Sequence, residues 1–583
     1  MVFSAAFIII IELCERTGYY TFQGTQKAWL EKQGYSNAAS SSMNQVFGLL
    51  SYISCFFGGW LAETPVGRYW TIMALVGVYV VGCFLAAIAT HENLESVPLY
   101  LVGTFVLIAL GTGGIKPNVC TFGADQIDPN DPHVEKKKES FFMYFYLTIN
   151  VGCVIAFGFL ANVATNGLPP LIPAESGYFG AYIIAASFMA VAWIVYLCGT
   201  RFYRKDSFRT NSESPLGLCW GRLIGGRSHL MGRVSLLGWA LIPVLIVMSI
   251  VQAFITSTAL TLTSLALDVV CIGCLCIAHR DNSWLGKADA VTRGLDVVPV
   301  LLIGNVVFNV LYNTMSSVFF SQACQMDLRL GSGTHAFQLS GAFFQLADSA
   351  AIIIFTPLID RLIPGAERLL GRSVSFNMKV YFGIAFAMGS QMVAAMLEYA
   401  RRDAEVLPVG SQCAPLLPGS ENHVRMSGLS AFWMFLPYAM IGIGEILVNP
   451  VLQHVAYEGA DASMRSLVQA FNLFAMGGMP NAVSAAISQA TASLVPNDLN
   501  EGNLPAVYFI NVAFGALGCI AYYLVSAGRP RKEEKYAVEK SDSSLDSAVE
   551  KPAGPVLLGR FEGVIESASN GKPVEETAVS LEL

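Results

Sequence analysis

Three charged residues with helical spacing stand inside the first apolar run of the chain. Glu12, Glu15, Arg16 and Tyr19 lie at positions i, i+3, i+4 and i+7, which places all four on one face of a helix. A charged side chain at the centre of a bilayer costs about 2.5–3.5 kcal/mol. This face therefore lines a cavity or pairs with polar groups inside a helical bundle.

A lysine at the end of another apolar run could meet these carboxylates. Lys116 follows the segment Gly111-Thr112-Gly113-Gly114-Ile115, whose glycines permit close approach of a neighbouring helix. Two carboxylates beside two cations form a site whose proton affinity depends on its neighbours, so replacing one partner by a solute favours protonation. The pattern indicates coupling of a polar solute to protons, with a static buried ion pair as the alternative.

The elements that hold these residues are predicted membrane-spanning helices. The chain is 54% hydrophobic and only 13% charged, whereas soluble domains are about 25% charged. Its apolar runs are about 20 residues long, as a bilayer requires. They lie near residues 2–28, 43–62, 70–90, 98–121, 141–163, 177–199, 234–254, 257–279, 295–322, 337–360, 376–399, 427–450, 465–490 and 505–527. We predict an all-α, polytopic membrane protein with about fourteen spans.

The spans fall into groups of six, two and six. The predicted parts are a first six-helix bundle (1–200), a cytoplasmic loop (201–233), an inserted helix pair (234–280), a second six-helix bundle (281–528) and a disordered tail (529–583). We expect the inserted pair to pack outside the twelve-helix core. The first apolar run leads directly to Glu12, so we take it as the first span and not as a cleaved signal.

Lysine and arginine are distributed unequally between the loops. With the N-terminus in the cytoplasm, the inner loops hold eighteen of these residues and the outer loops six. Positive charge accumulates on the cytoplasmic side, so we predict a multi-pass membrane protein with both termini in the cytoplasm. Both the plasma membrane and the vacuolar membrane are compatible with this topology.

The two halves repeat a short loop pattern. The second span ends at Glu63 and is followed by Gly67-Arg68, and the corresponding point of the second half has Asp360-Arg361 and Gly371-Arg372. An acid, a turn and a Gly-Arg pair can form a hydrogen-bonded latch between helix ends. The first copy resembles the loop motif of the major facilitator superfamily, and repeated halves are typical of transporters with a site between them.

Six segments in chain order resemble the proton-dependent oligopeptide transporter family, which includes plant nitrate and peptide transporters. The similarity covers roughly residues 5–527, and the inserted helix pair resembles that of bacterial members. The segments are Glu12-x-x-Glu15-Arg16-x-x-Tyr19-Tyr20, Gly111 to Asn118, Phe145 to Gly152, Gln322 to Asp327, Gly444-Glu445, and Ala462 to Leu467.

The resemblance implies roles for particular residues. It places Glu12, Glu15, Arg16 and Lys116 in a proton-coupling and salt-bridge cluster, and Tyr19, Tyr20, Asn150 and Glu445 in the substrate cavity. It further implies a major-facilitator fold of two six-helix bundles, with protons, a small-molecule substrate and the lipid bilayer as partners. We expect no cofactor, no metal site and no nucleic-acid partner.

The chain also departs from the family pattern. Gln23 stands where many peptide carriers have arginine, and the usual acidic partner in the seventh span is absent from Tyr312-Asn313-Thr314-Met315. Loss of only one partner would leave a buried charge unpaired, so the paired absence is physically consistent. Asn472 stands at a position that is commonly tryptophan.

Three acids and a cysteine cluster remain to be interpreted. Asp348 stands where the family usually has asparagine, and we predict that it lines the cavity together with Glu445, an acid inside the apolar run 427–450. Asp268 lies in the inserted pair and is interpreted as structural. Cys271, Cys274, Cys276 and His279 have a spacing compatible with metal binding, but without a second ligand pair we interpret them as ordinary helix residues.

We therefore predict a proton-coupled symporter of small peptides (di- and tripeptides) that works by alternating access. The alternative within transport is a proton-coupled carrier of nitrate or another small organic solute. The alternative from another class of protein is a non-transporting membrane sensor with this fold. The intact charged cluster argues against a sensor. An enzyme is not expected, because we find no metal-protease motif and no nucleophile–base arrangement.

Overall fold

The computed structural model describes residues 3–128, 130–205, 215–286, 289–331, 333, 336–371, 374–417, 422–461 and 464–527. The tail predicted as disordered, Arg372 of the second loop pattern, and Ala462-Ser463 of the sixth motif lie outside the described residues, and so does the side chain of Glu63.

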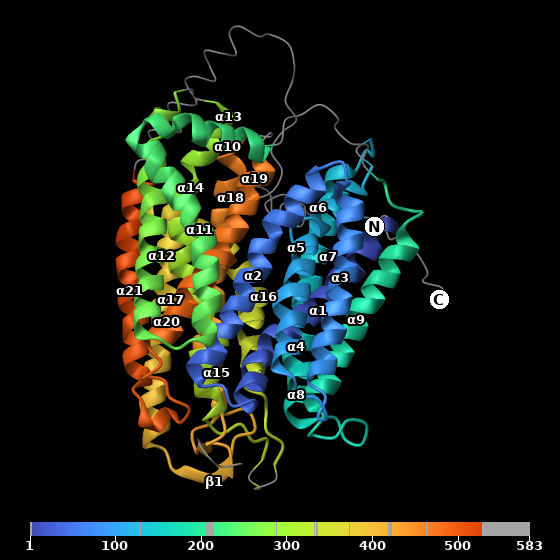
Figure 1. Ribbon diagram of the computed structural model, residues 1–583, viewed down its shortest axis with the longest axis vertical. Helices are drawn as coiled ribbons and strands as arrows, with labels where there is room; N and C mark the ends of the chain where they lie inside the picture. The colour runs from blue at the N-terminus through green and yellow to red at the C-terminus, as the bar shows by residue number, and fades with distance from the viewer. Residues whose placement is uncertain are drawn as a thin grey trace. The chain divides into compact units, whose positions relative to one another are not determined.

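The first six predicted spans are helices that pack together in one half of the described chain. They are α1 (Phe3–Lys32), α2 (Asn37–Glu63), α3 (Gly67–Ala89), the run α4–η1–α5–α6 (Val97–Leu101, Val102–Ile108, Ala109–Ile115, Val119–Asp125), the run α7–η2–α8 (Val134–Cys153, Val154–Leu160, Ala161–Asn166) and α9 (Gly177–Gly199). Helix α1 packs against α9, α7 and α2, so its charged face is enclosed by other helices. Figure 1 shows this group in blue to teal.

The last six spans form the second half, drawn in light green to red in Figure 1. They are α13–α14–η5–α15 (Ala290–Asp296, Val298–Tyr312, Asn313–Ser316, Val318–Cys324), η6–α16 (Gly341–Gln345, Leu346–Leu370), α17 (Phe376–Asp403), η7–α18 (Ala431–Met434, Phe435–Glu458), α19–η8–α20 (Arg465–Leu473, Phe474–Gly478, Met479–Ala490) and α21 (Leu504–Ser526).

In the described part of the chain, twelve helices are long and apolar enough to cross a membrane. The other two predicted spans coincide with α1 and with α19–η8–α20, which are helical over their length but more polar than the rest. Helix α1 carries Glu12, Glu15 and Arg16 within five residues. The predicted span positions therefore agree with the helices, and polarity separates these two from the other twelve.

The inserted pair consists of α11 (Leu230–Phe254) and α12 (Thr258–His279), which pack against each other. Helix α11 also contacts α2 and α20, and α12 contacts α14 and α20. The pair thus lies against helices of both halves. A short helix that the sequence reading missed, α10 (Pro215–Gly225), precedes the pair.

One end of the bundle carries the antiparallel strands β1 (Val406–Gly410) and β2 (Arg425–Ser427), and we refer to it as the hairpin end (Figure 1). A disulfide at this end joins Cys324, the last residue of α15, to Cys413 in the connection between the strands. This pairing is not predicted from the sequence.

Glycines allow α2 and α5 to pack backbone to backbone. A Cβ atom added at Gly58 would stand 1.9 Å from the Gly113 carbonyl oxygen, and one added at Gly113 would stand 2.2 Å from the Ser54 carbonyl oxygen. Asn118 strengthens the contact by donating from Nδ2 to the carbonyl oxygens of Gly58 (3.1 Å) and Gly114 (3.0 Å). The predicted close helix approach is present, and it fixes the position of Lys116 at the end of α5.

Candidate functional site

The charged face of α1 forms a compact buried cluster. Arg16 Nε lies 2.6 Å from Glu12 Oε1 and 3.3 Å from Glu15 Oε2. Both carboxylates are buried, and Glu12 Oε2 has no hydrogen-bond partner among the described residues. One arginine thus serves two acids that sit one turn apart, as the i, i+3, i+4 spacing requires. Gly152 of α7 lets that helix approach, since a Cβ atom there would stand 2.6 Å from Arg16 Cβ.

Lys116 reaches the same helix face by a different contact from the one predicted. Its Nζ lies 3.8 Å from the ring centroid of Tyr19 and 4.6 Å from that of Tyr52. Among the described residues it forms this double cation–π contact and no ion pair within 4 Å of either carboxylate. Lys116 still interacts electrostatically with Glu12 and Glu15. The two rings thus hold the ammonium group beside the charged cluster.

The first-half residues predicted to line the cavity fall into two groups. Tyr19 is buried and stacks on Phe47 with ring centroids 5.5 Å apart, whereas Tyr20 is half-buried and lies 5.5 Å from Phe157. Asn150 is buried and donates from Nδ2 to the Tyr146 carbonyl oxygen one turn earlier (3.0 Å). Tyr19 therefore belongs to the support of Lys116, while Tyr20 lies towards the second half.

Asp348 and Glu445 come together where α16 crosses α18. A Cβ atom at Gly442 would stand 2.6 Å from the Asp348 carbonyl oxygen and 2.9 Å from its Oδ1, and Glu445 follows Gly442 by one helical turn. The two acids interact electrostatically. Asn449 Nδ2 donates to Glu445 Oε1 (3.2 Å), and Glu445 Oε2 and Asp348 Oδ1 have no hydrogen-bond partner among the described residues. We refer to Asp348 and Glu445 as the acid pair.

Tyrosines from the first half lie within electrostatic range of the acid pair. Glu445 interacts with Tyr20 of α1, Tyr52 of α2 and Tyr146 of α7. Cys153 of α7 interacts electrostatically with Arg16, Asp348 and Glu445. The charged face of α1 and the acid pair therefore share one polar region between the two halves.

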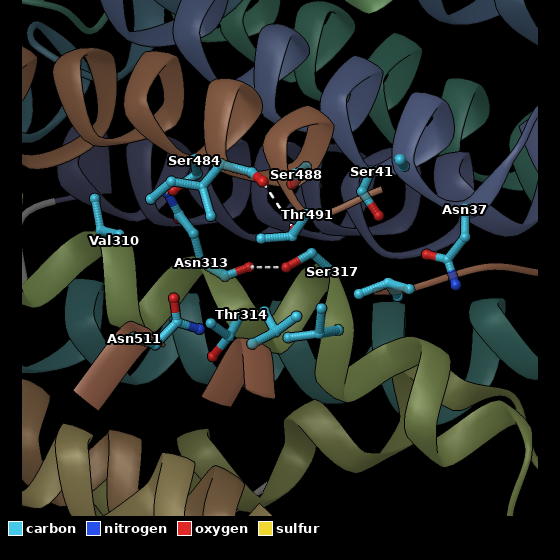
Figure 2. A pocket seen from close by; sticks show the side chains of 15 residues that line it. Asn37, Ser41, Val310, Asn313, Thr314, Ser317, Ser484, Ser488, Thr491 and Asn511 are labelled. Atoms are coloured by element: carbon cyan, nitrogen blue, oxygen red, sulfur yellow. Dashed lines mark hydrogen bonds between the residues drawn. The ribbon is translucent and has the colours of Figure 1, made fainter. Parts of the chain in front are cut away.

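Hydrogen bonds between the halves gather at the hairpin end. The Asn37 N–H donates to Asn497 Oδ1 (3.0 Å), the Ser340 N–H donates to Asn162 Oδ1 (2.8 Å), and Gln45 Nε2 donates to the Asn313 carbonyl oxygen (3.3 Å). Asn313 also donates to Ser484 Oγ (3.0 Å). Figure 2 shows Asn313, Ser317 and Ser484 around the small polar pocket at this interface. Uncharged groups therefore join the two halves at this end. They lie next to Tyr312-Asn313-Thr314-Met315, a segment without an acidic residue.

A buried ion pair that sequence reading missed lies beside this interface. Lys27 pairs with Glu31, and both side chains are buried. Lys27 Nζ also donates to Asn37 Oδ1 (2.9 Å), which accepts a second hydrogen bond from Ser321 Oγ of the other half (3.0 Å). The i, i+4 spacing of a lysine and a glutamate in an apolar run was the signal that could have revealed the pair.

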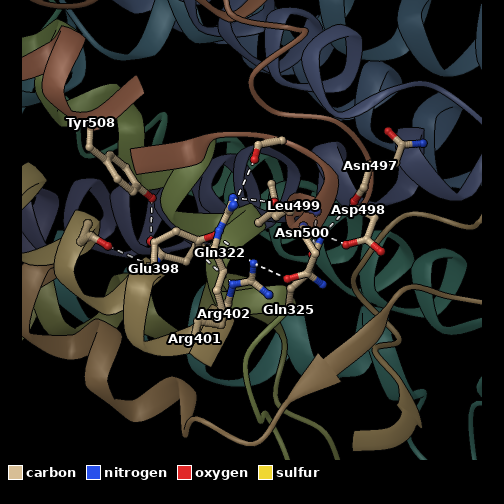
Figure 3. A network of polar contacts seen from close by, with 12 residues as sticks. Gln322, Gln325, Glu398, Arg401, Arg402, Asn497, Asp498, Leu499, Asn500 and Tyr508 are labelled. Atoms are coloured by element: carbon tan, nitrogen blue, oxygen red, sulfur yellow. Dashed lines mark hydrogen bonds and ion pairs between the residues drawn. The ribbon is translucent and has the colours of Figure 1, made fainter. Parts of the chain in front are cut away.

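A second polar network lies at the hairpin end of the second half (Figure 3). Glu398 of α17 accepts hydrogen bonds from Arg401 Nε and Arg402 Nε, each at 2.8 Å. Arg401 also donates to Asn500 Oδ1 (3.0 Å), and Arg402 to the Leu499 carbonyl oxygen (2.6 Å). These contacts tie α17 to the loop before α21 and lie apart from the acid pair, so we interpret them as structural.

One contact of the first loop pattern can be described, whereas the side chain of Glu63 lies outside the described residues. Arg68 at the start of α3 pairs with Asp125 at the end of α6, 2.5 Å apart. Asn472, at the position commonly tryptophan, accepts a hydrogen bond at its Oδ1 from Asn305 Nδ2 of α14 (2.9 Å). In the cysteine–histidine group of α12, His279 hydrogen-bonds Ser235 (2.9 Å) and Asn282 (2.8 Å), and Cys271 Sγ donates to the Gly238 carbonyl oxygen (3.3 Å).

Comparison with known proteins agrees with this geometry. Among curated proteins, Protein NRT1/ PTR FAMILY 8.1 of Arabidopsis thaliana is 26% identical over 575 residues, which cover 89% of this chain and 92% of that protein. Peptide transporter family 1 of Caenorhabditis elegans is 28% identical over 361 residues, which cover 61% and 40%.

Solved structures show the same fold. The crystal structure of the POT family transporter PepTSo aligns with a TM-score of 0.71 at 23% identity and covers 91% of this chain and 98% of that one. An auto-inhibited POT family peptide transporter aligns with a TM-score of 0.69 at 22% identity, over 90% and 96%. The PTR2 family model, described as the POT family, matches residues 69–501. The chain therefore belongs to the POT family of membrane transporters and is not an enzyme.

Proposed function

We propose that this transporter is a proton-coupled symporter of small peptides, with preference for solutes that carry an amino group. The supporting observation is the acid pair: Asp348 and Glu445 share one region, and each keeps a carboxylate oxygen without a protein partner. Two such acids attract an ammonium group and repel a small anion. The names of the Arabidopsis relatives leave room for other solutes, so an anion such as nitrate is the second outcome to be tested.

Proton coupling is assigned to Glu12, Glu15, Arg16 and Lys116. Arg16 is shared between two carboxylates, and Glu12 Oε2 has no hydrogen-bond partner among the described residues. Lys116 lies close by, with its ammonium group on the ring of Tyr19. Adding a proton to either carboxylate weakens its hold on Arg16, and the electrostatic balance that positions Lys116 changes with it. We propose that this change reaches the solute site through the polar region that the cluster and the acid pair share.

We assign the hairpin end to the outside of the membrane and both termini to the cytoplasm. The unequal distribution of lysine and arginine supports this orientation. The Cys324–Cys413 disulfide supports it independently, because disulfides persist on the non-cytosolic side of membranes. With this orientation, the hydrogen bonds at the hairpin end close the transporter to the outside. Alternating access then requires these contacts to separate while residues 1–200 and 281–528 move as units.

The decisive experiment is uptake into proteoliposomes with an imposed pH gradient. Radiolabelled dipeptides and nitrate are offered in parallel to the wild type, Asp348→Asn and Glu445→Gln. We expect proton-driven dipeptide uptake by the wild type, its loss in Glu445→Gln and a milder decrease in Asp348→Asn. Strong nitrate uptake that neither substitution alters would contradict the peptide assignment and favour an anion carrier.

A further inference from the structure

The inserted helix pair contains a group of buried polar side chains without protein partners. Ser249 and Gln252 of α11, and Ser264 and Asp268 of α12, are at most 2% exposed. Ser249 Oγ, Ser264 Oγ, both oxygens of Asp268 and both polar atoms of Gln252 have no hydrogen-bond partner among the described residues. We refer to these four residues as the α11–α12 oxygen cluster.

The two serines differ from other hydroxyl residues in the spans. Ser51, Thr104 and Thr112 each donate to the carbonyl oxygen one turn earlier, at 2.8–3.0 Å. This local bond is the usual way to satisfy a hydroxyl in an apolar helix. Ser249 and Ser264 make no such bond, so their oxygens remain available to another group.

The register of the two antiparallel helices places the serines opposite each other. Ser235 Oγ and His279 Nε2 are 2.9 Å apart, and a Cβ atom at Gly238 would stand 2.9 Å from Leu275 side-chain atoms. From these contacts towards the connection at 255–257, each step forward along α11 matches one step back along α12. Ser249 therefore lies at the level of Ser264. In the same way, Asp268 lies at the level of Leu245.

The direction of the side chains brings the remaining two residues towards this level. A helical side chain leans towards the N-terminus of its own helix. Asp268 therefore leans towards Ser264, and Gln252 leans towards Ser249. The backbones of Asp268 and Gln252 are separated by about 10 Å along the helix axes, from the rise per residue. Because both side chains lean towards the level of the serines, the separation of their polar ends along the axes is smaller. Register and side-chain direction thus bring two hydroxyls, one carboxylate and one amide towards one level of the α11–α12 pair.

This set of groups has the chemistry of a cation site. A lone buried carboxylate in a membrane needs a positive partner or a proton. Hydroxyl, amide and carboxylate oxygens are the ligands that hard cations prefer. One carboxylate balances a single positive charge, whereas a divalent ion would leave net charge in the apolar region. A proton would engage one atom of Asp268 and leave the two serines and Gln252 unsatisfied.

We propose that the α11–α12 oxygen cluster binds a sodium ion, independently of the proposed peptide symport. Helix α11 packs on α2 and α20, and α12 packs on α14 and α20. The bound ion joins the inserted pair into one unit and stabilises its contact with helices of both halves. The interpretation of Asp268 as merely structural is thereby replaced by a ligand role.

The test uses the full chain, purified in lipid nanodiscs in choline chloride at constant ionic strength. Sodium chloride or potassium chloride replaces choline, and thermal unfolding and binding of ²²Na⁺ are measured. The variants are Asp268→Asn and Ser264→Ala. Ser235→Ala is the matched control, because it removes a buried hydroxyl from the same helix interface at the His279 end.

We expect sodium to raise the unfolding temperature of the wild type and Ser235→Ala by about 2 °C, from the linkage between binding and stability. About one ²²Na⁺ should bind per chain. Asp268→Asn should lose both effects even if it is more stable overall, and Ser264→Ala should weaken binding. The proposal is overturned if sodium acts no differently from choline, if its effect survives in Asp268→Asn, or if only pH changes the unfolding temperature. Dipeptide uptake is a separate readout, so either proposal can fail without the other.

Discussion

Gly442 of α18 lies against Asp348 of α16 so closely that a side chain at position 442 would meet the Asp348 carbonyl oxygen at 2.6 Å. The missing side chain allows the two helices to cross at this point. As a result, Asp348 lies near Glu445, one turn further along α18, and two acids from distant parts of the sequence face one region. The solute preference that we propose rests on this crossing.

The acid pair should discriminate between solutes by charge. Glu445→Gln removes a negative charge from the proposed amine site, and we expect dipeptide uptake to fall while any nitrate uptake is unchanged or rises. Competition between an unmodified dipeptide and one with an acetylated amino group measures the effect. The wild type should prefer the free amine. Equal competition by both dipeptides would show that the acid pair does not recognise it.

The charged cluster should be required for coupling but not for every mode of transport. Glu15→Gln and Lys116→Ala should abolish uptake driven by a pH gradient, because the cluster can no longer change its protonation and its partners together. Exchange of labelled for unlabelled solute at equal pH should persist in at least one of the variants, since it needs no net proton movement. Normal uphill uptake by both variants would reduce the cluster to a structural ion pair.

The backbone contact that positions Lys116 should tolerate no side chain. Gly113→Ala places a methyl group 2.2 Å from the Ser54 carbonyl oxygen, so α5 must move away from α2. Overpacking of this kind costs about 1–3 kcal/mol, and we expect a lower unfolding temperature and weaker proton-driven uptake.

Gly59→Ala is the control for this prediction. A Cβ atom at Gly59 would meet only Pro117, at 4.0 Å, so its effect should stay within about 0.5 kcal/mol. If the two substitutions had the same effect on unfolding and uptake, the α2–α5 contact would not determine the position of Lys116.

Replacing Lys27 alone should lower the stability of the fold much more than replacing both Lys27 and Glu31. Lys27→Met leaves the Glu31 carboxylate buried without its cation, which costs about 3–5 kcal/mol. The double variant Lys27→Met/Glu31→Leu should recover most of this loss. Lys32→Met is the control, because Lys32 and Glu95 are exposed partners 3.5 Å apart and their contact is worth less than about 1 kcal/mol. Thermal unfolding of the wild type and these three variants measures the comparison, and a double variant no more stable than Lys27→Met would contradict it.

The proposed orientation predicts which end of the bundle reacts from outside a cell. Asn93→Cys lies in the exposed connection after α3 at the hairpin end, and Gly221→Cys is exposed on α10 at the opposite end. A membrane-impermeant maleimide should label Asn93→Cys in intact cells, and Gly221→Cys only after permeabilisation. The parent background is Cys198→Ser, which removes the exposed native thiol. The reverse labelling pattern would invert the orientation.

The positions of the spans and the charged face of α1 could be predicted because both depend on local sequence. Apolar runs of bilayer length mark helices, and the spacing of Glu12, Glu15 and Arg16 places them on one face whatever surrounds them. The closeness of α2 and α5 followed in the same way from the glycines before Lys116.

Contacts between distant segments were less accessible to sequence reasoning. Lys116 was expected to pair with carboxylates, but the rings of Tyr19 and Tyr52 lie closer to its ammonium group. The disulfide of Cys324 with Cys413 depends on a loop of irregular structure, which has no periodic pattern. The ion pair of Arg68 with Asp125 joins the start of α3 to the end of α6, 57 residues apart in the chain.

The most direct test of the account is the initial rate of dipeptide uptake into proteoliposomes, with and without an inwardly directed proton gradient, for the wild type and Glu445→Gln. The account predicts that the gradient accelerates uptake by the wild type and that Glu445→Gln loses dipeptide uptake under both conditions. Uptake by the wild type that is unaffected by the gradient, or wild-type rates in Glu445→Gln, would contradict it.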